Sequence, residues 1–427
     1  MQNYSNHSNI FAVVNKFQHS NSNMVKVKDI FKRNKASIFL FIVLIVSFII
    51  ENINGRFWLN DFKVYYTAAS RLFNGGTLYN EAFGLGSGYY KYSPFAAAFF
   101  IPFTFLPYKI AAIIYYFIIA YLIVQVLKMA LYLANIIAGK EIPMNQQSIL
   151  LYVFLAGIVH LQRELHLGNV NILLLSILLF SLKKMLDGKM LLPAILLGLV
   201  ILFKPHFIIF IPSLLLRKKF GIALLSMITV MVGLMIPSLF LGVHQNVELH
   251  SQWLQTMQTH NAGIIDARQT IYSILYQYLI QFFIPQPDKV YLLILLMMAG
   301  MAVSFFIVNH LINERAAKTS ETINSNGHFI SEFFLLLALV PSLTLTDSEH
   351  FLLSLPLITV LIYFLVNKGV SKMMASLIIM GQLFYGGNIH DLLGGKLSDL
   401  VETMGLLGVG NLVLIGLFYF VDVRNDR

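Results

Sequence analysis

The stretch SIFLFIVLIVSFIIENI, residues 37–53, is a continuous apolar run with no charged residue before Glu51. A helix of this length is sufficient to cross the hydrocarbon core of a bilayer. The run resembles the apolar region of a signal peptide, but Glu51-Asn52-Ile53-Asn54 offers no small-residue cleavage site. We therefore expect an uncleaved membrane anchor.

Similar apolar runs recur along most of the 427 residues, of which 57% are hydrophobic and 12% are charged. That charged fraction is about half of the value usual for a soluble domain. The runs are continuous rather than alternating, which excludes a transmembrane barrel. The composition predicts an all-α polytopic integral membrane protein. Because the chain has no cysteine, it has no disulfide, no thiolate zinc site and no cysteine nucleophile.

The net charge of +10 is distributed in the manner of a membrane protein. Basic residues crowd the tail 1–36 and recur between apolar runs, for example at Lys183-Lys184 and Arg217-Lys218-Lys219. By the positive-inside rule these segments are cytoplasmic. No basic stripe with interleaved aromatic residues is present, so we expect no nucleic-acid partner. The tail 1–36, rich in Asn and Ser, is predicted to be disordered.

One path through the membrane is consistent with these charges. It has about twelve crossings in a single transmembrane domain, residues 37–422, followed by a cytoplasmic tail, residues 423–427. Five segments are external on this path. The first is a large loop, residues 54–92, and the second is Pro94 to Pro107, which lies at the outer interface or dips in and out of the membrane. The others are a turn from His160 to Asn169, the junction Lys204-Pro205-His206 between two short segments near 190–203 and 206–216, and a polar loop from Gly242 to about Thr270. A later crossing is expected at 290–312.

The polar clusters without a basic excess all fall on the external side of this path. They include the groups around Asp61, Arg163, Lys204 and His350. Polar side chains near a membrane core are costly and tend to line a cavity. The sequence therefore predicts a polar site open to the non-cytoplasmic face of a cytoplasmic or inner membrane.

Four stretches carry a family resemblance, and they extend with their surroundings from about residue 55 to 366. The third stretch, residues 167–171, has Asn169 where the family usually has the Gln of a Gly-Gln-X-Asn motif. A later Ser348-Glu349-His350 matches a histidine-bearing external turn more loosely. The stretches are Asp61-Phe62-Lys63-Val64-Tyr65-Tyr66 with Asn74-Gly75-Gly76-Thr77-Leu78-Tyr79, Tyr92-Ser93-Pro94-Phe95 with Ile101-Pro102-Phe103 and Leu106-Pro107, Leu167-Gly168-Asn169-Val170-Asn171, and Leu202-Phe203-Lys204-Pro205. Together they resemble glycosyltransferase family 87.

The resemblance implies a GT-C fold and a polyprenyl-phosphate-linked sugar donor, typically of mannose. It also implies a catalytic aspartate in the first external loop, here Asp61, with the active site on the non-cytoplasmic face. The acceptor is expected to be a lipid or a glycan. No cofactor and no metal site are expected, since the histidines show no ligand spacing of the HExxH kind.

The chemistry asks for the same residue types. A carboxylate close to an acceptor hydroxyl acts as general base, and a single carboxylate suits inversion of the anomeric carbon. We therefore assign Asp61 as the base. The alternative is that Asn60 or Asp61 merely begins the helix containing Tyr65 to Leu72.

Cations and imidazoles are expected to hold the donor phosphate. Lys204 and His206 lie at the junction of two short segments, and Arg163 offers a forked guanidinium. His350 is assigned to catalysis, as a hydrogen-bond donor or proton carrier. The alternatives are a lysine that snorkels to water, an Arg163 paired with Glu164, and a structural histidine.

Sugar or acceptor contacts are assigned to polar and aromatic residues of the motifs. Tyr89, Tyr90 and Tyr92 either stack on sugars or form an interfacial aromatic belt. Two other functions stay open: a transporter or flippase of a lipid-linked saccharide, and a ligase moving a whole glycan. The assigned contacts are Lys63, Tyr65, Tyr92, Asn169 and Asn171.

Overall fold

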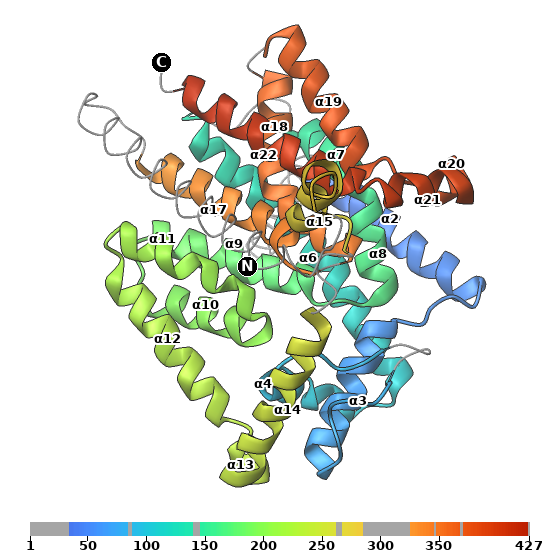
Figure 1. Cartoon of the computed structure of the whole chain (residues 1–427), viewed down its shortest axis with the longest axis vertical. Coiled ribbons are helices and arrows are strands. Elements are labelled where there is room, and N and C mark those ends of the chain that lie inside the picture. The colour runs from blue at the N-terminus through green and yellow to red at the C-terminus, as the bar shows by residue number, and fades with distance from the viewer. Residues whose placement is uncertain are drawn as a thin grey trace, which may run out of the picture.

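The computed structural model describes residues 34–83, 88–139, 146–261, 267–284, 325–345, 347–367 and 370–425. Within these ranges the chain is helical, and no strand forms beyond an isolated bridge between Ala82 and Tyr89. The all-α prediction is therefore confirmed for the described part of the chain. Figure 1 shows one bundle of helices of unequal length that cross at varied angles.

The helices carry the following labels. They are α2 (Lys35–Ile53), α3 (Asn60–Asn74), α4 (Pro94–Phe99), α5 (Ile101–Thr104), α6 (Tyr108–Ile137), α7 (Gln146–Ala156), α8 (Ile158–Leu167), α9 (Asn171–Leu186), α10 (Leu191–Phe203), the 3₁₀ turn η1 (Pro205–Ile209), α11 (Phe210–Leu216), α12 (Phe220–Met235), α13 (Ser238–Leu241), α14 (Val243–Asn261), α15 (Ile271–Leu275), the π turn η2 (Tyr276–Ile280), α17 (Ser325–Leu343), the 3₁₀ turn η3 (Ser348–Ser354), α18 (Leu355–Asn367), α19 (Lys372–Gly386), α20 (His390–Leu393), α21 (Gly395–Thr403) and α22 (Leu406–Asn425).

Five stretches of helix in the described part are long and apolar enough to cross a membrane. The number rises to seven if the bent pairs α7–α8 and α21–α22 each count as one span. The chain is thus a multi-pass membrane protein. The total of about twelve crossings remains a prediction, and the crossing expected at 290–312 lies outside the described residues, as do residues 1–33 of the tail.

The turn expected from His160 to Asn169 is wrong, because helix α8 continues to Leu167. Helices α7 and α8 are bent by 65° at Gly157, where a Cβ atom would lie 2.5 Å from a methyl carbon of Leu355. Within α8 the backbone N–H and C=O groups bond to one another. An irregular turn would leave these groups unpaired near the hydrocarbon region of the membrane. The turn itself is confined to the few residues after Leu167.

The segment 54–92, predicted to be the first external loop, contains α3, an amphipathic helix. Its apolar face, which includes Phe62, Tyr65 and Leu72, is buried. The segment Pro94 to Pro107 forms the short helices α4 and α5, and Ser93 caps α4 by accepting a hydrogen bond from Ala96 N. Ser93 also donates to the Leu202 carbonyl at 2.5 Å, which ties the loop to α10.

The polar loop expected from Gly242 to about Thr270 is also wrong for much of its length, because residues Val243–Asn261 form α14. Residues spaced by three or four positions on α14 face the protein, among them Trp253 and Met257. The indole of Trp253 donates to the Lys91 carbonyl at 3.1 Å. That bond holds α14 against the segment that contains Lys91.

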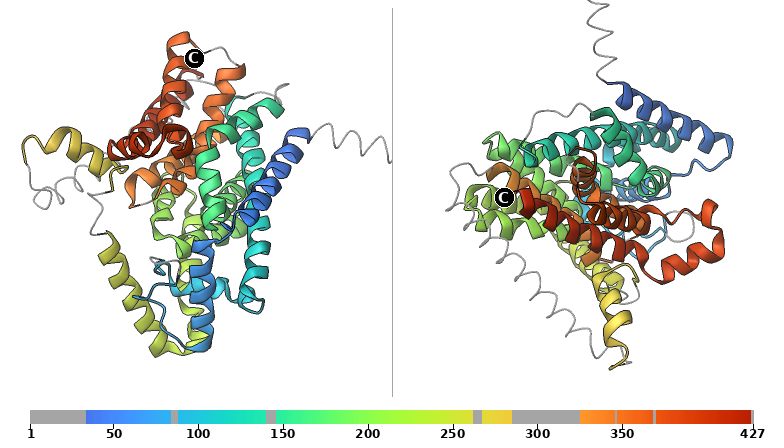
Figure 2. Two further views of the ribbon diagram at one scale, coloured as in Figure 1. Left: turned by 90° about the vertical axis from the view of Figure 1, so that its right-hand side faces the viewer. Right: turned by 90° about the horizontal axis from the view of Figure 1, so that it is seen from above.

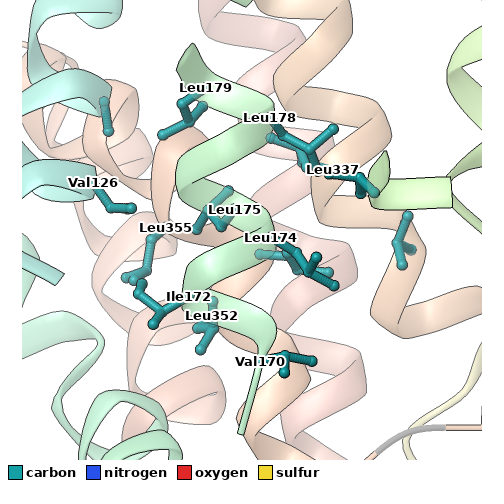
Figure 3. Packing of buried hydrophobic residues seen from close by; sticks show 14 of the residues in the cluster. Val126, Val170, Ile172, Leu174, Leu175, Leu178, Leu179, Leu337, Leu352 and Leu355 are labelled. Atoms are coloured by element: carbon teal, nitrogen blue, oxygen red, sulfur yellow. The ribbon is translucent and has the colours of Figure 1, made fainter. Parts of the chain in front are cut away.

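The core centres on α9, which packs against α6, α10 and η3. Figure 3 shows the leucines of α9 meeting Val126, Leu337 and Leu355 from three other helices. Close packing through small residues supports the neighbouring pair α10–α12: a Cβ on Gly198 would lie 2.6 Å from Thr229 Cβ. In a bilayer such close packing, rather than exclusion of water, drives helix association.

A buried polar network fixes η3 to the C-terminal helices. Asn411 of α22 accepts a hydrogen bond from the Ser354 hydroxyl at 2.6 Å and donates to the Ser342 hydroxyl at 2.9 Å. In both views of Figure 2 the red C-terminal helices and the yellow-green α10–α12 group belong to one bundle. The network therefore holds η3 at the centre of the molecule.

Candidate active site

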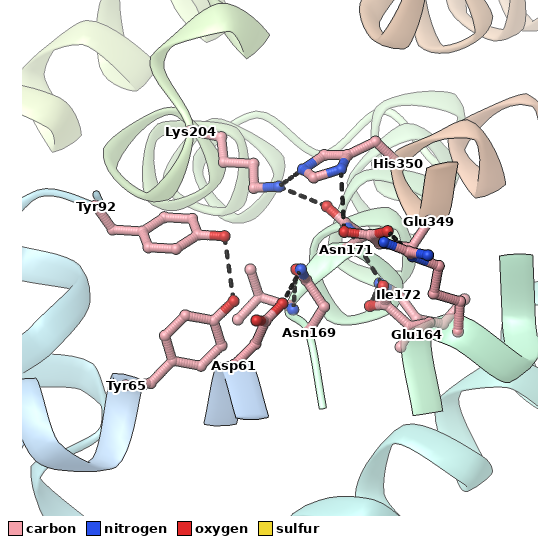
Figure 4. A network of polar contacts seen from close by, with 12 residues as sticks. Asp61, Tyr65, Tyr92, Glu164, Asn169, Asn171, Ile172, Lys204, Glu349 and His350 are labelled. Atoms are coloured by element: carbon pink, nitrogen blue, oxygen red, sulfur yellow. Dashed lines mark hydrogen bonds and ion pairs between the residues drawn. The ribbon is translucent and has the colours of Figure 1, made fainter. Parts of the chain in front are cut away.

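A cavity of about 1670 Å³ opens between the segment predicted to be the first external loop and the C-terminal helices. Its walls come from α3, residues 88–92, α8, residues 203–206, α14, η3 and α20–α21. Segments far apart in the chain therefore meet around one polar space. Figure 4 shows the side chains at the centre of its wall.

Asp61 lies in the first turn of α3 and lines the cavity. Its Oδ2 accepts a hydrogen bond from Asn169 Nδ2 at 2.6 Å. No N-cap hydrogen bond is made by a side chain at this helix start, where Leu59 occupies the cap position. Asp61 is thus turned toward the cavity wall rather than back onto its own helix.

Gly168 explains how Asn169 reaches Asp61. It ends α8 with φ +66°, and a Cβ there would lie 3.0 Å from Phe62 Cβ and 3.1 Å from Leu59 Cβ. Only a residue without a side chain allows this approach together with left-handed backbone. The motif residue Gly168 therefore brings the α8–α9 turn onto the start of α3.

Burial raises the pKa of the Asp61 carboxyl from 3.8 to about 6, since water that would solvate the charge is excluded. The neighbouring carboxylate Glu349 raises this pKa further, whereas the hydrogen bond from Asn169 and the charge of Lys204 lower it. A carboxyl with such a pKa exchanges protons near neutral pH.

Lys204 lies at the break between α10 and η1, as the sequence predicts. Pro205 has no backbone N–H and cannot continue α10, so Lys204 takes an extended conformation. Its side chain is buried yet lines the cavity. The ammonium Nζ donates to Asn171 Oδ1 at 2.6 Å and lies 2.7 Å from His350 Nε2.

Arg163 lies at the cavity with half of its side chain exposed. Its Nε donates to Glu349 Oε2 at 2.7 Å, so its ion-pair partner is Glu349 of η3 and not the adjacent Glu164. The alternative pairing within α8 is therefore wrong, because the buried Glu164 carboxylate accepts its hydrogen bonds from the start of α9.

Glu164 is fully buried and accepts two hydrogen bonds from the first turn of α9. Ile172 N donates to its Oε1 at 2.8 Å, and Asn171 Nδ2 donates to its Oε2 at 3.0 Å. In the sequence, Glu164 stands out only as a neighbour and alternative partner of Arg163. The segment 158–167 also carries His160, Gln162 and His166, so no local signal marks Glu164 as the acceptor for the start of α9.

Two tyrosines form one side of the wall. The hydroxyls of Tyr65 and Tyr92 lie 3.1 Å apart, and Lys204 Nζ lies 5.6 Å from the centre of the Tyr92 ring. Tyr90, in contrast, is buried and donates to the Ser93 carbonyl. Tyr90 is thus neither exposed to a sugar nor part of an interfacial belt.

The remaining predicted contacts divide in two. His206 lines the cavity beside Lys204, and its buried Nε2 has no hydrogen-bond partner among the described residues. Asn169 also lines it, whereas Lys63 and Asn171 are not part of the lining. Asn171 reaches the site only through Lys204.

A second polar group in the cavity was not foreseen. His166 Nδ1 lies 2.9 Å from a carboxylate oxygen of Glu51, and Gln162 Nε2 donates to the same carboxylate at 3.3 Å. These residues join the end of α2 to α8. Within the described residues, no group of three or more His, Asp or Glu side chains is arranged to hold a metal ion.

The family comparison agrees with the resemblance in the motifs. The model of glycosyltransferase family 87 matches residues 90–338, more than half of the chain. The matched range contains Arg163, Asn169 and Lys204, while Asp61 and His350 lie outside it. Among curated protein sequences, none matches this chain.

Proposed function

The chain belongs to glycosyltransferase family 87, and from that premise we propose a donor, an acceptor class and a mechanism. As a membrane glycosyltransferase it takes a sugar from a donor and passes it to an acceptor. The proposed donor is a hexose, mannose, linked to a polyprenyl phosphate. The proposed acceptor is a lipid-linked saccharide or glycan on the non-cytoplasmic face.

One observation carries the proposal: Asp61, with its raised pKa, shares a single cavity with Lys204, His206 and His350. A base and a group of phosphate-binding nitrogens are the two parts that transfer from a phosphate-linked sugar requires. A transporter of a lipid-linked saccharide needs no general base to activate an acceptor hydroxyl, so the two parts together favour a transferase. The cavity is also large enough for two substrates to meet.

In the proposed reaction, Asp61 takes the proton from an acceptor hydroxyl. The hydroxyl oxygen then forms a bond to the anomeric carbon while the bond from that carbon to the phosphate oxygen breaks. The electron pair leaves with the phosphate, whose added charge is stabilised by Lys204 and the nearby imidazoles. A single displacement inverts the anomeric centre.

The other carboxylates of the cavity wall are less suited to this role. Glu349 is engaged by Arg163, and Glu164 is engaged by the start of α9. Asp347 lies before η3 and lines the cavity at an exposed position. Asp347 therefore serves as the matched control for Asp61.

The test uses the full chain purified into lipid nanodiscs, with radiolabelled polyprenyl-phosphate mannose and a membrane lipid extract as acceptor. We expect a labelled product from the wild type and from Asp347→Asn, and a loss of at least about a hundredfold with Asp61→Asn. Retained activity of Asp61→Asn would remove the base assignment. Product formed from a nucleotide sugar alone would remove the lipid-linked donor.

A further inference from the structure

The two oxygens of Glu164 have different partners. Oε1 accepts from Ile172 N and so caps the start of α9, whereas Oε2 accepts from Asn171 Nδ2. The carboxylate is fully buried and is not part of the cavity lining. Glu164 therefore cannot touch a substrate directly.

The second oxygen begins a chain of hydrogen bonds that ends in the cavity. Asn171 donates a hydrogen bond from its amide Nδ2 to Glu164 Oε2, and its Oδ1 accepts a hydrogen bond from Lys204 Nζ, 2.6 Å away. Lys204 Nζ in turn lies 2.7 Å from His350 Nε2. Figure 4 shows Lys204 and His350 above Asn171, with Glu164 below it.

We propose that Glu164 is a positioning residue for donor binding: through Asn171 it holds the Lys204 ammonium against the cavity. This inference rests on the proposed function, in which Lys204 binds the donor phosphate. A lysine has a flexible four-carbon stem and a point charge, so its ammonium has a fixed place only if an acceptor fixes it. A buried ammonium and a buried carboxylate also each need compensation, which the bridge through Asn171 supplies.

The competing role for Glu164 is a cap of α9 alone, and Glu164→Gln separates the two roles. The glutamine oxygen still accepts from Ile172 N, which preserves the cap. The glutamine amide is a donor, however, and it meets the donor Nδ2 of Asn171. Asn171 must then reverse its amide, which turns a donor toward the ammonium of Lys204 and removes the acceptor.

A second substitution restores the chain of bonds. In Glu164→Gln with Asn171→Asp, the glutamine amide donates to one oxygen of the new aspartate, whose other oxygen accepts from Lys204. The negative charge has moved one residue along the same chain. A pure capping role gives Asn171→Asp no reason to rescue Glu164→Gln.

The experiment measures binding of farnesyl phosphate, a short isoprenoid phosphate, to the full chain by calorimetry, with farnesol as the control that lacks the phosphate. We expect Glu164→Gln to weaken farnesyl phosphate binding about tenfold, the double variant to return it to within about twofold of wild type, and farnesol binding to be unchanged. Glu332→Gln serves as a control. It removes another buried carboxylate, which pairs with Arg217, and should leave binding unchanged.

Thermal midpoints of all variants show which of them fold. Wild-type affinity in Glu164→Gln, or a failure of the double variant to recover affinity while it keeps its thermal midpoint, would overturn the positioning role. If Lys204→Met binds farnesyl phosphate as tightly as wild type, or if the wild type does not bind it, the phosphate site of the proposed function is itself wrong. The two failures are therefore distinguishable.

Discussion

At the scale of single residues, Asp61 is largely enclosed by protein and still lines the cavity. Its carboxyl is expected to titrate at about 6 because burial disfavours the charged form. A general base acts only when ionised, whereas the phosphodiester of the proposed donor stays ionised throughout this range. The pH dependence of transfer should therefore report Asp61.

We expect kcat/KM for transfer to be level above pH 7 and to fall about tenfold for each pH unit below 6. The measurement is the initial rate in nanodiscs between pH 4.5 and 8, with a return to pH 7 as control for irreversible loss. An acid limb near the ordinary aspartate pKa of 3.8 would contradict the burial effect on this group.

The same pKa affects stability. Between pH 4 and 6 the unfolded chain has released the Asp61 proton and the folded chain still binds it, so stability falls as the pH rises. Below pH 4 both the folded and the unfolded chain carry the Asp61 proton, and the stability that protonation of Asp61 gives to the folded state is fully present. Asp61→Asn carries no charge to bury, so its thermal midpoint should exceed that of wild type at pH 8 and approach it at pH 4.

The control for this stability difference is Asp347→Asn, at an exposed position of the same cavity. It should not reproduce the pH-dependent gap, which is measured as the thermal midpoint in one detergent at each pH. An equal gap for both variants would show that general charge repulsion, and not burial of Asp61, is responsible.

Residue types and motifs allowed part of the site to be predicted. Asp61, Lys204 and His350 do line one cavity. The partner of Arg163 could not be predicted, since Glu164 adjoins it in sequence while the helix directs the two side chains apart. The role of Asn171 behind Lys204 likewise depends on the packing of α9 against α10, which no local pattern encodes.

At the scale of elements, the α8–α9 turn couples the fold to the site. Gly168→Ala should lower kcat and the thermal midpoint together, because a methyl group would press on Leu59 and Phe62 at the start of α3. The left-handed backbone alone costs roughly 1–2 kcal/mol for a residue with a side chain. The displacement of Asn169 from Asp61 is the additional effect on catalysis.

Gly188→Ala is the matched control. Gly188 has φ +72° in the turn after α9, and a Cβ there would have no atom within 4 Å. It should share the conformational cost and keep kcat at the wild-type value. Equal losses of kcat in both variants would mean that Gly168 acts through stability alone, and stability-normalised rates would reveal this.

Element types were predictable where the apolar runs are continuous, as in α2 and in α10–α11 with their break at Lys204. They were missed where helices are amphipathic. Polar residues on one face of α8 and α14 suggested loops, yet each helix buries the other face. In such helices the backbone groups form hydrogen bonds with one another, and a single apolar stripe is enough to pack against the protein.

At the scale of the whole molecule, the distribution of charge predicts the side of the membrane on which the cavity opens. Lys189 belongs to a basic turn between α9 and α10, and Gln255 is exposed on α14, two residues from the cavity-lining Met257. The positive-inside rule assigns the basic turn to the cytoplasm and hence α14 to the opposite face. A lipid-linked sugar displayed outside the cell membrane would then reach the cavity directly.

The absence of cysteine makes this sidedness measurable, because each introduced cysteine is the only thiol of the chain. In intact cells, a membrane-impermeant maleimide should label Gln255→Cys and leave Lys189→Cys unlabelled, and permeabilised cells should label both. Labelling of Lys189→Cys alone in intact cells would show that the topology is the inverse of the predicted one. Asp61, in the same cavity wall as Met257, would then face the cytoplasm, where nucleotide sugars become the available donors and the lipid-linked donor loses its main support.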